Sequence, residues 1–220
     1  MKRKISFVFL LFVAVTLSSQ TFRISIEPGY GFYDMGKLHQ IQDSWANNYI
    51  DLGVIAIERF PSYFNQSFGI DWYVSPKFLI GLNAAILSTG GRNSVKDYSG
   101  DYKLDIMVNA QLYGLETEYN YQLVRNLYSY LNLKTGIISS TLNVNENLVV
   151  SNTTLIDNNS ATLKESNLYI EPSTGIRYFI NKSLSLCIGI DYLIDFGAYS
   201  NEKYINWSGC QLKSGVAFSF

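Results

Sequence analysis

The chain has 220 residues and a formal net charge of −1, with 16% charged and 15% aromatic residues. Soluble domains usually carry about 25% charged residues, so this chain is short of surface charge, and no basic stripe supports nucleic-acid binding. No apolar run after residue 20 reaches the roughly 20 residues of a transmembrane helix. Such a composition without a helical span is typical of a transmembrane β-barrel.

The first 19 residues have the pattern of an export signal. Lys2, Arg3 and Lys4 precede an apolar run from Ile5 to Leu17, and small polar residues follow. This pattern predicts a cleaved signal peptide over residues 1–19, which leaves residues 20–220 as one barrel domain. With no cysteine near the cleavage site, a lipoprotein anchor is not expected.

The remaining chain alternates apolar and polar residues with a period of two, which predicts β-strands. The expected strands cover residues 22–32, 64–74, 78–88, 104–123, 127–137, 168–180, 184–196 and 209–220. Within residues 104–123 the alternation changes frame near Gly114, which suggests a β-bulge. We therefore predict an all-β, eight-stranded antiparallel up-and-down transmembrane β-barrel. Ten strands, with residues 48–58 as a further strand, is the weaker alternative.

The connections support this topology independently. Short connections at 75–77, 124–126 and 181–183 alternate with long ones at 33–61, 89–103, 138–166 and 197–207. All short connections therefore lie at one end, as in outer-membrane barrels with short periplasmic turns and long extracellular loops. Alternating residues within the long loops, such as Ser139 to Asn145, indicate that some strands continue beyond the membrane as hairpins.

Charged residues and glycines share one face of the strands. A crowded barrel interior explains small residues beside charges, whereas a solvated outer face would not need them. This favours a membrane barrel over a soluble lipocalin-like barrel with apolar residues inside. The predicted lumen charge network consists of Arg23, Glu27, Asp71, Lys134, Glu171, Arg177, Asp191, Asp195 and Lys213.

Two segments within this network are alike. Residues 26–31 and 170–175 each carry an inward Glu followed by Pro, and each strand also carries an inward Arg, Arg23 or Arg177. Buried charges must be paired, so a salt-bridged filling of the lumen is expected. A gated ion path or cation site is the alternative. Cys187 is expected inside and Cys210 outside, which excludes a disulfide between them.

The terminal residues Leu212, Val216, Phe218 and Phe220 resemble the C-terminal signal that the outer-membrane barrel assembly machinery reads. By this strand, the loop asymmetry and its size, the mature chain resembles small eight-stranded outer-membrane barrels of the OmpA/OmpX type. Residues 27–35, 88–92 and 97–100 also resemble segments of uncharacterised Bacteroidota outer-membrane barrels. The resemblance implies a location in outer-membrane lipid and no particular activity. We expect the protein to be a monomer.

The sequence contains few candidate catalytic or metal-binding residues. His39 is the only histidine, so a lipid A-modifying enzyme using His39 is a minor alternative. The spacing of Asp97, Asp101 and Asp105 lacks the ordered pattern of a calcium loop, and one His with two separated Cys makes no zinc set. We therefore expect no catalytic, cofactor or metal site. The predicted function is a non-enzymatic envelope barrel with a structural or surface-binding role and an unidentified loop ligand, with a narrow pore as the alternative.

Overall fold

A computed structural model describes residues 22–35, 37–38, 63–96, 100–150, 156–199 and 205–220. Eight antiparallel strands form a closed barrel in chain order, and β1 also pairs with β8. The strands are β1 (Phe22–Tyr33), β2 (Tyr63–Ser75), β3 (Phe78–Lys96), β4 (Gly100–Val124), β5 (Leu127–Val150), β6 (Ile156–Phe179), β7 (Leu184–Asp195) and β8 (Gly209–Ser219). A short 3-10 helix, η2 (Phe196–Tyr199), follows β7. The eight-stranded up-and-down barrel is confirmed, while residues 48–58 of the ten-strand alternative lie outside the described residues.

Across the described ranges, no helix is both long and apolar enough to cross a bilayer.

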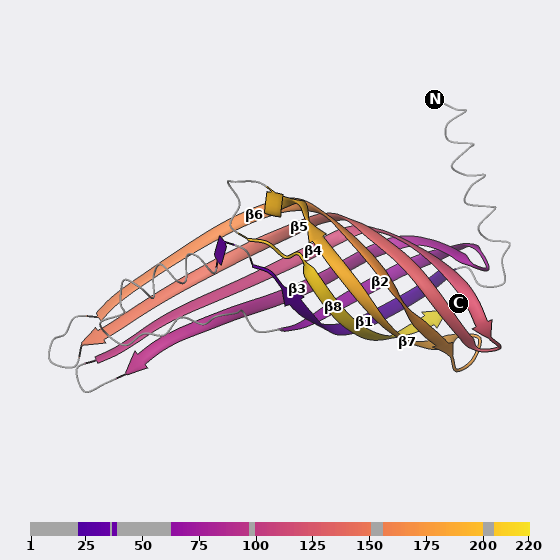
Figure 1. Ribbon diagram of the computed structural model, residues 1–220, viewed down its shortest axis with the longest axis horizontal. Coiled ribbons are helices and arrows are strands. Elements are labelled where there is room, and N and C mark those ends of the chain that lie inside the picture. Colours follow the sequence, from indigo (N-terminus) through magenta and orange to yellow (C-terminus); the bar gives the residue numbers. More distant parts are fainter. Residues whose placement is uncertain (1–21, 36, 39–62, 97–99, 151–155, 200–204) are drawn as a thin grey trace, which may run out of the picture.

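Four strands are about twice as long as the others. Strands β3 to β6 have 19 to 25 residues, whereas β1, β2, β7 and β8 have 11 to 13. Figure 1 shows these four strands continuing together as a curved sheet beyond the barrel. We call this part the sheet extension. It begins just beyond Ala84, Tyr113, Ile137 and Leu168, on the side away from the short turns.

The sheet extension replaces two of the predicted loops. Most of 89–103 and 138–166 is strand, because paired ladders such as Arg92 with Asp105 and Val144 with Ala161 continue in register. The alternation of apolar and polar residues in these segments had indicated that the strands continue. The expectation of hairpins beyond the barrel is confirmed, and the assignment of these ranges as loops is wrong.

The barrel turns its apolar residues outward. Leu131 and Ile188 are 64% and 65% exposed, whereas Arg23 and Lys134 are each 1% exposed. A soluble barrel would bury the apolar face instead, because removing apolar surface from water is the main driving force of folding. The lipocalin-like alternative is therefore wrong.

No bulge interrupts β4 at Gly114. Gly114 pairs with Asn83 on one side and Gly136 on the other, within unbroken ladders. The only shift along β4 and β5 lies between Gln122 and Val124, next to the turn. What changes at Gly114 is the chemistry of the inner face, from buried Leu112 to buried Glu116, and not the frame.

The outer face changes at the same level. An outward row pairs Ala84, Tyr113, Ile137 and Leu168 across β3 to β6; we call it the boundary row. The next two outward rows away from the short turns are mainly polar: Ile86, Gln111, Ser139 and Ser166, then Ser88, Asn109, Thr141 and Lys164. Below the boundary row the sheet is thus apolar outside and charged inside.

Above the boundary row this arrangement is reversed. The inner face of the sheet extension carries a buried apolar core near the barrel, which the segments after β1 and before β8 also join, while Ala161 and Leu163 farther along this face are exposed. Trp207 donates from Nε1 to Ser140 Oγ at 2.9 Å, and its ring meets Tyr33 edge-on with centroids 4.9 Å apart. The core includes Met35, Leu38, Leu87, Tyr102, Leu104, Ile106, Val108, Leu112, Ile138, Leu142, Ile205 and Trp207.

Candidate functional site: the charged lumen

The first ion cluster lies toward the short turns and centres on Glu118 of β4. Arg23 of β1 donates from Nη1 and Nη2 to its two carboxylate oxygens at 2.6 and 2.8 Å, and from Nε to Asp71 of β2 at 2.9 Å. Arg177 of β6 donates to both oxygens of the same carboxylate, one of them at 3.0 Å. Paired N–H donors make such bonds directional and strong. Two guanidiniums thus share one carboxylate in the middle of the lumen, and we call this group the arginine clamp.

The second cluster lies nearer the boundary row and contains two lysines. Lys134 Nζ lies 3.3 Å from Glu171, 3.4 Å from Asp191 and 3.6 Å from Glu27. Lys213 Nζ lies 2.9 Å from Glu171 and 2.7 Å from Asp191. Both ammonium groups therefore bridge the same two carboxylates, and this arrangement is the lysine cluster.

Glycines make room for the large side chains of the lumen. Tyr130 of β5 lies over Gly175 and Gly189, where a Cβ would meet the tyrosine hydroxyl. The Arg177 guanidinium lies 5.1 Å from the centre of the Tyr130 ring, within cation–π range. Glycine on the charged face is therefore needed for space, because the eight-stranded barrel is narrow.

The predicted network residues all face inward, but they do not form one group. Arg23, Asp71 and Arg177 belong to the arginine clamp, whereas Glu27, Lys134, Glu171, Asp191 and Lys213 belong to the lysine cluster. Asp195 is separate: its carboxylate accepts from the backbone N–H groups of Gly197 at 2.9 Å and Trp207 at 3.4 Å.

Sequence reasoning missed the acids of β4. Glu116 and Glu118 are both buried and inward, and Asn132 donates to Glu116. The predicted lumen charge network did not include these two acids. An unbroken alternation through Gly114, Glu116, Glu118 and Asn120 was the available signal.

The strands that carry the two alike segments contribute matching residues to both layers of the lumen. Arg23 of β1 and Arg177 of β6 both bind Glu118 in the arginine clamp. Glu27 of β1 and Glu171 of β6 both lie beside Lys134 in the lysine cluster.

The geometry holds charge in fixed pairs and leaves little access for water. Apart from Glu27, the side chains of both clusters are almost fully buried. A passage wide enough for water beside these groups would expose them, so they block the barrel axis. Among the described residues no cluster of His, Cys, Asp and Glu has the geometry of a metal site.

The remaining residues singled out by sequence lie elsewhere. Leu212, Val216, Phe218 and Phe220 all point outward from the closing strand, and the Phe220 ring stacks on Phe22 at 4.9 Å. His39 and Asp97 lie outside the described residues. Cys187 is buried and Cys210 half-buried on the opposite face, and both are free thiols as predicted.

Exposed ion pairs mark the outer face of the sheet extension. Arg92 Nε donates to Asp105 at 2.5 Å, and Lys103 donates to Asp101 at 2.9 Å. The hydrogen bond and charge of Asp105 raise the pKa of the Arg92 guanidinium above its ordinary value. Asp101 and Asp105 are thus each engaged with a cation beside them, and they do not converge on a common ion.

Comparisons with known proteins find barrels of low similarity. No family model matches the chain, and no curated protein matches it. Neisserial surface protein A aligns at 10% identity and a TM-score of 0.49, covering 90% of this chain and 96% of that one. Ail, the attachment invasion locus protein of Yersinia pestis, aligns at 8% identity and 0.45, covering 92% and 100%. The N-terminal barrel domain of Pseudomonas aeruginosa OprF aligns at 12% and 0.44, covering 92% and 100%.

Proposed function

We propose that this protein is a non-enzymatic outer-membrane β-barrel that anchors a water-exposed sheet extension in the envelope. The observation that carries the proposal is the boundary row, where both faces of one continuous sheet exchange their chemistry. Apolar side chains cover the outside of the closed barrel below the row, and polar and ion-paired side chains cover the outside above it.

Two different surroundings explain this reversal. Lipid contact favours apolar side chains outside, and a Lys or Arg at the bilayer midplane on that face costs about 2–4 kcal/mol. Water contact favours polar side chains outside and requires apolar residues to be buried within. A strand that leaves a bilayer and enters water therefore needs apolar side chains on its outer face in the first half and on its inner face in the second, without a change of register.

The short turns then lie on the periplasmic side, and the sheet extension lies outside the cell. The lumen between them is filled by the arginine clamp and the lysine cluster. Desolvated charges are tolerable when paired in this way. We infer that the barrel conducts no ions and that its role lies in what the sheet extension presents, by structure or by binding. In this scheme the outward residues of β8 meet lipid and carry the signal for the assembly machinery.

Cell fractionation and a gel test address the location. We expect the protein in the outer-membrane fraction, with an unheated SDS gel band that shifts on boiling. An epitope inserted between β5 and β6 should be stained on intact cells, whereas the same epitope in the turn at Arg125 should be stained only after permeabilisation. A soluble protein without a heat shift, or the opposite staining, would overturn the proposal.

Planar-bilayer recording addresses the closed lumen. We expect no discrete conductance steps from the refolded protein at any applied voltage. Regular single-channel steps that disappear when the protein is omitted would support the narrow pore instead.

A further inference from the structure

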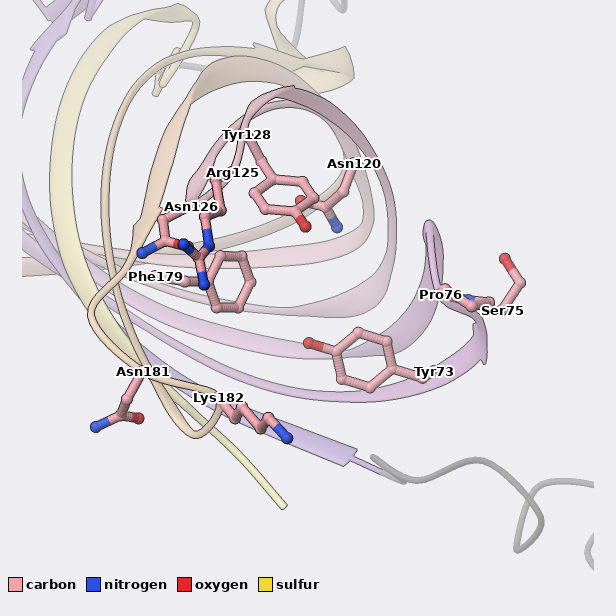
Figure 2. A pocket seen from close by; sticks show the side chains of 10 residues that line it. All are labelled: Tyr73, Ser75, Pro76, Asn120, Arg125, Asn126, Tyr128, Phe179, Asn181 and Lys182. Carbon is pink, nitrogen blue, oxygen red and sulfur yellow. The ribbon is translucent and has the colours of Figure 1, made fainter.

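A pocket opens at the short-turn end of the barrel, on the side of the arginine clamp away from the sheet extension. It has a volume of about 520 Å³, within the range of roughly 300–1,000 Å³ that small-molecule sites occupy. Figure 2 shows side chains from all three short turns and their flanking strands around this space. We call it the turn-end pocket.

The rim of the turn-end pocket is basic. Each of the three short turns carries one cation, Lys77, Arg125 or Lys182, and no acid. Arg125 and Lys182 line the pocket, whereas Lys77 does not. Among the described residues no carboxylate side chain lines the pocket, so the exposed Arg125 guanidinium at its rim favours an anion.

The wall of the pocket is aromatic and faces inward. Tyr73, Tyr128 and Phe179 line it, and the Tyr128 and Phe179 rings meet edge-on with centroids 5.1 Å apart. The Tyr73 hydroxyl is within hydrogen-bond distance of Ser219 Oγ, at 3.1 Å. Aromatic rings with polar edges offer apolar area and hydrogen bonding together.

The floor of the pocket holds an unused acceptor. Asn120 lines the pocket and is 6% exposed. Its Nδ2 donates to Glu118 at 2.8 Å, which fixes the amide orientation, and its buried Oδ1 has no hydrogen-bond partner in the part of the chain that the structure describes. Such an atom usually has a protein or water partner, so it is positioned to accept from a donor that enters the pocket.

We propose that the turn-end pocket binds a small carboxylated sugar, such as an acidic amino sugar of the cell-wall glycan. The carboxylate pairs with the Arg125 guanidinium, whose two N–H donors suit a carboxylate, a hydroxyl or amide N–H donates toward Asn120, and the sugar ring packs on Tyr128 and Phe179. Each feature of the pocket meets one group of this ligand class. The choice of a cell-wall sugar rests on the proposed placement of the short turns in the periplasm, whereas the pocket itself is separate from the sheet extension.

Anionic lipid is the competing explanation for basic turns, but it fits the geometry less well. Headgroups would meet the outer rim of the barrel, where Lys77 and Arg125 are both exposed. The aromatic wall and Asn120 lie on the inner face instead, where a ligand must enter along the barrel axis. A lipid surface would therefore use Lys77 as much as Arg125, whereas a ligand in the pocket would use Arg125 alone.

The test titrates the refolded protein in zwitterionic micelles with N-acetylmuramic acid, followed by isothermal calorimetry and by NMR of the sugar. N-acetylglucosamine, which lacks the carboxylate, is the matched neutral probe. We expect saturable binding of the acidic sugar that is roughly tenfold tighter than that of the neutral one, as for a hydrogen-bonded charge pair. Equal affinity for both sugars, or no binding of either, would overturn the proposal.

Variants separate the pocket from general charge attraction. Arg125→Ala should weaken acidic-sugar binding by roughly threefold to tenfold, as a partly exposed charge contact does. Lys77→Ala removes the same charge from the same end and should leave the affinity unchanged. An equal loss in Lys77→Ala and Arg125→Ala, or displacement of the sugar by phosphatidylglycerol added to the micelles, would assign the basic turns to a lipid surface.

Discussion

Gly114 of β4 lies directly opposite Gly136 of β5, one position below the boundary row. On one side of this pair the inner face carries Glu116 and Lys134, and on the other it carries Leu112 and Ile138. The two glycines therefore mark the level at which the interior changes from an ion network to an apolar core.

The glycine pair is predicted to be intolerant of any side chain. A Cβ at Gly136 would lie 2.5 Å from Gly114 Cα and closer still to the Tyr113 carbonyl oxygen, and neither backbone atom can move alone. We expect Gly136→Ala to lower the free energy of unfolding by roughly 1–3 kcal/mol. Urea unfolding in lipid vesicles measures it. Ser139→Thr adds one methyl group to the outer face of the same strand and should have little effect; an equal effect of both would refute the prediction.

The arginine clamp is predicted to be the most sensitive point of the lumen. Glu118→Gln keeps the shape but leaves two buried guanidiniums without their shared charge. We expect a loss of about 3–5 kcal/mol in unfolding free energy, as for other broken buried pairs. Urea titration followed by tryptophan fluorescence checks this. Asp105→Asn breaks the exposed pair with Arg92 and serves as the control. Similar unfolding midpoints for the two variants would contradict a structural clamp.

Charge on the outside of the barrel should be costly only below the boundary row. Leu133→Lys places an ammonium among apolar outward residues of β5. We expect it to cost about 2–4 kcal/mol in vesicles if the residue lies near the midplane. Asn145→Lys places the same ammonium group on the outer face of the sheet extension and should leave the free energy of unfolding unchanged. Comparable stability of the two variants would argue against lipid contact.

The two cysteines should remain unpaired under oxidation. Cys187 points inward, where its Sγ lies 3.8 Å from Glu27, and Cys210 lies on the opposite face of the sheet. Side chains on opposite faces do not meet disulfide geometry. We expect diamide treatment of the folded protein to leave its gel mobility unchanged and both thiols free for alkylation after unfolding. An intramolecular crosslink in the folded state would show that the facing of β7 or β8 is wrong.

The sequence predicts the barrel well because strand facing follows a period of two. The alternation of Phe218, Val216 and Leu212 with smaller residues is local, and the segregation of short and long connections needs no contact information. The nine network positions were found in the same way, by their shared parity. The side of the sheet that each residue faces can therefore be predicted from the local sequence alone.

Sequence reasoning failed where the surroundings of a strand change along its length. Leu112 and Glu118 face the same way, but one lies in an apolar core and the other in an ion network. Taking apolar residues as one face turned this change into a false bulge. The turn-end pocket was missed for another reason: Asn120, Arg125 and Lys182 come together only through the closure of the barrel.

The length of the sheet extension has a mechanical consequence. On β5 it runs from Ser139 to Val150, and at about 3.3 Å per residue it spans roughly 40 Å. Four paired strands resist bending far better than a flexible loop of the same length. In the proposed orientation the tip would stand well clear of the headgroup layer, so that a large partner could reach it without touching the bilayer.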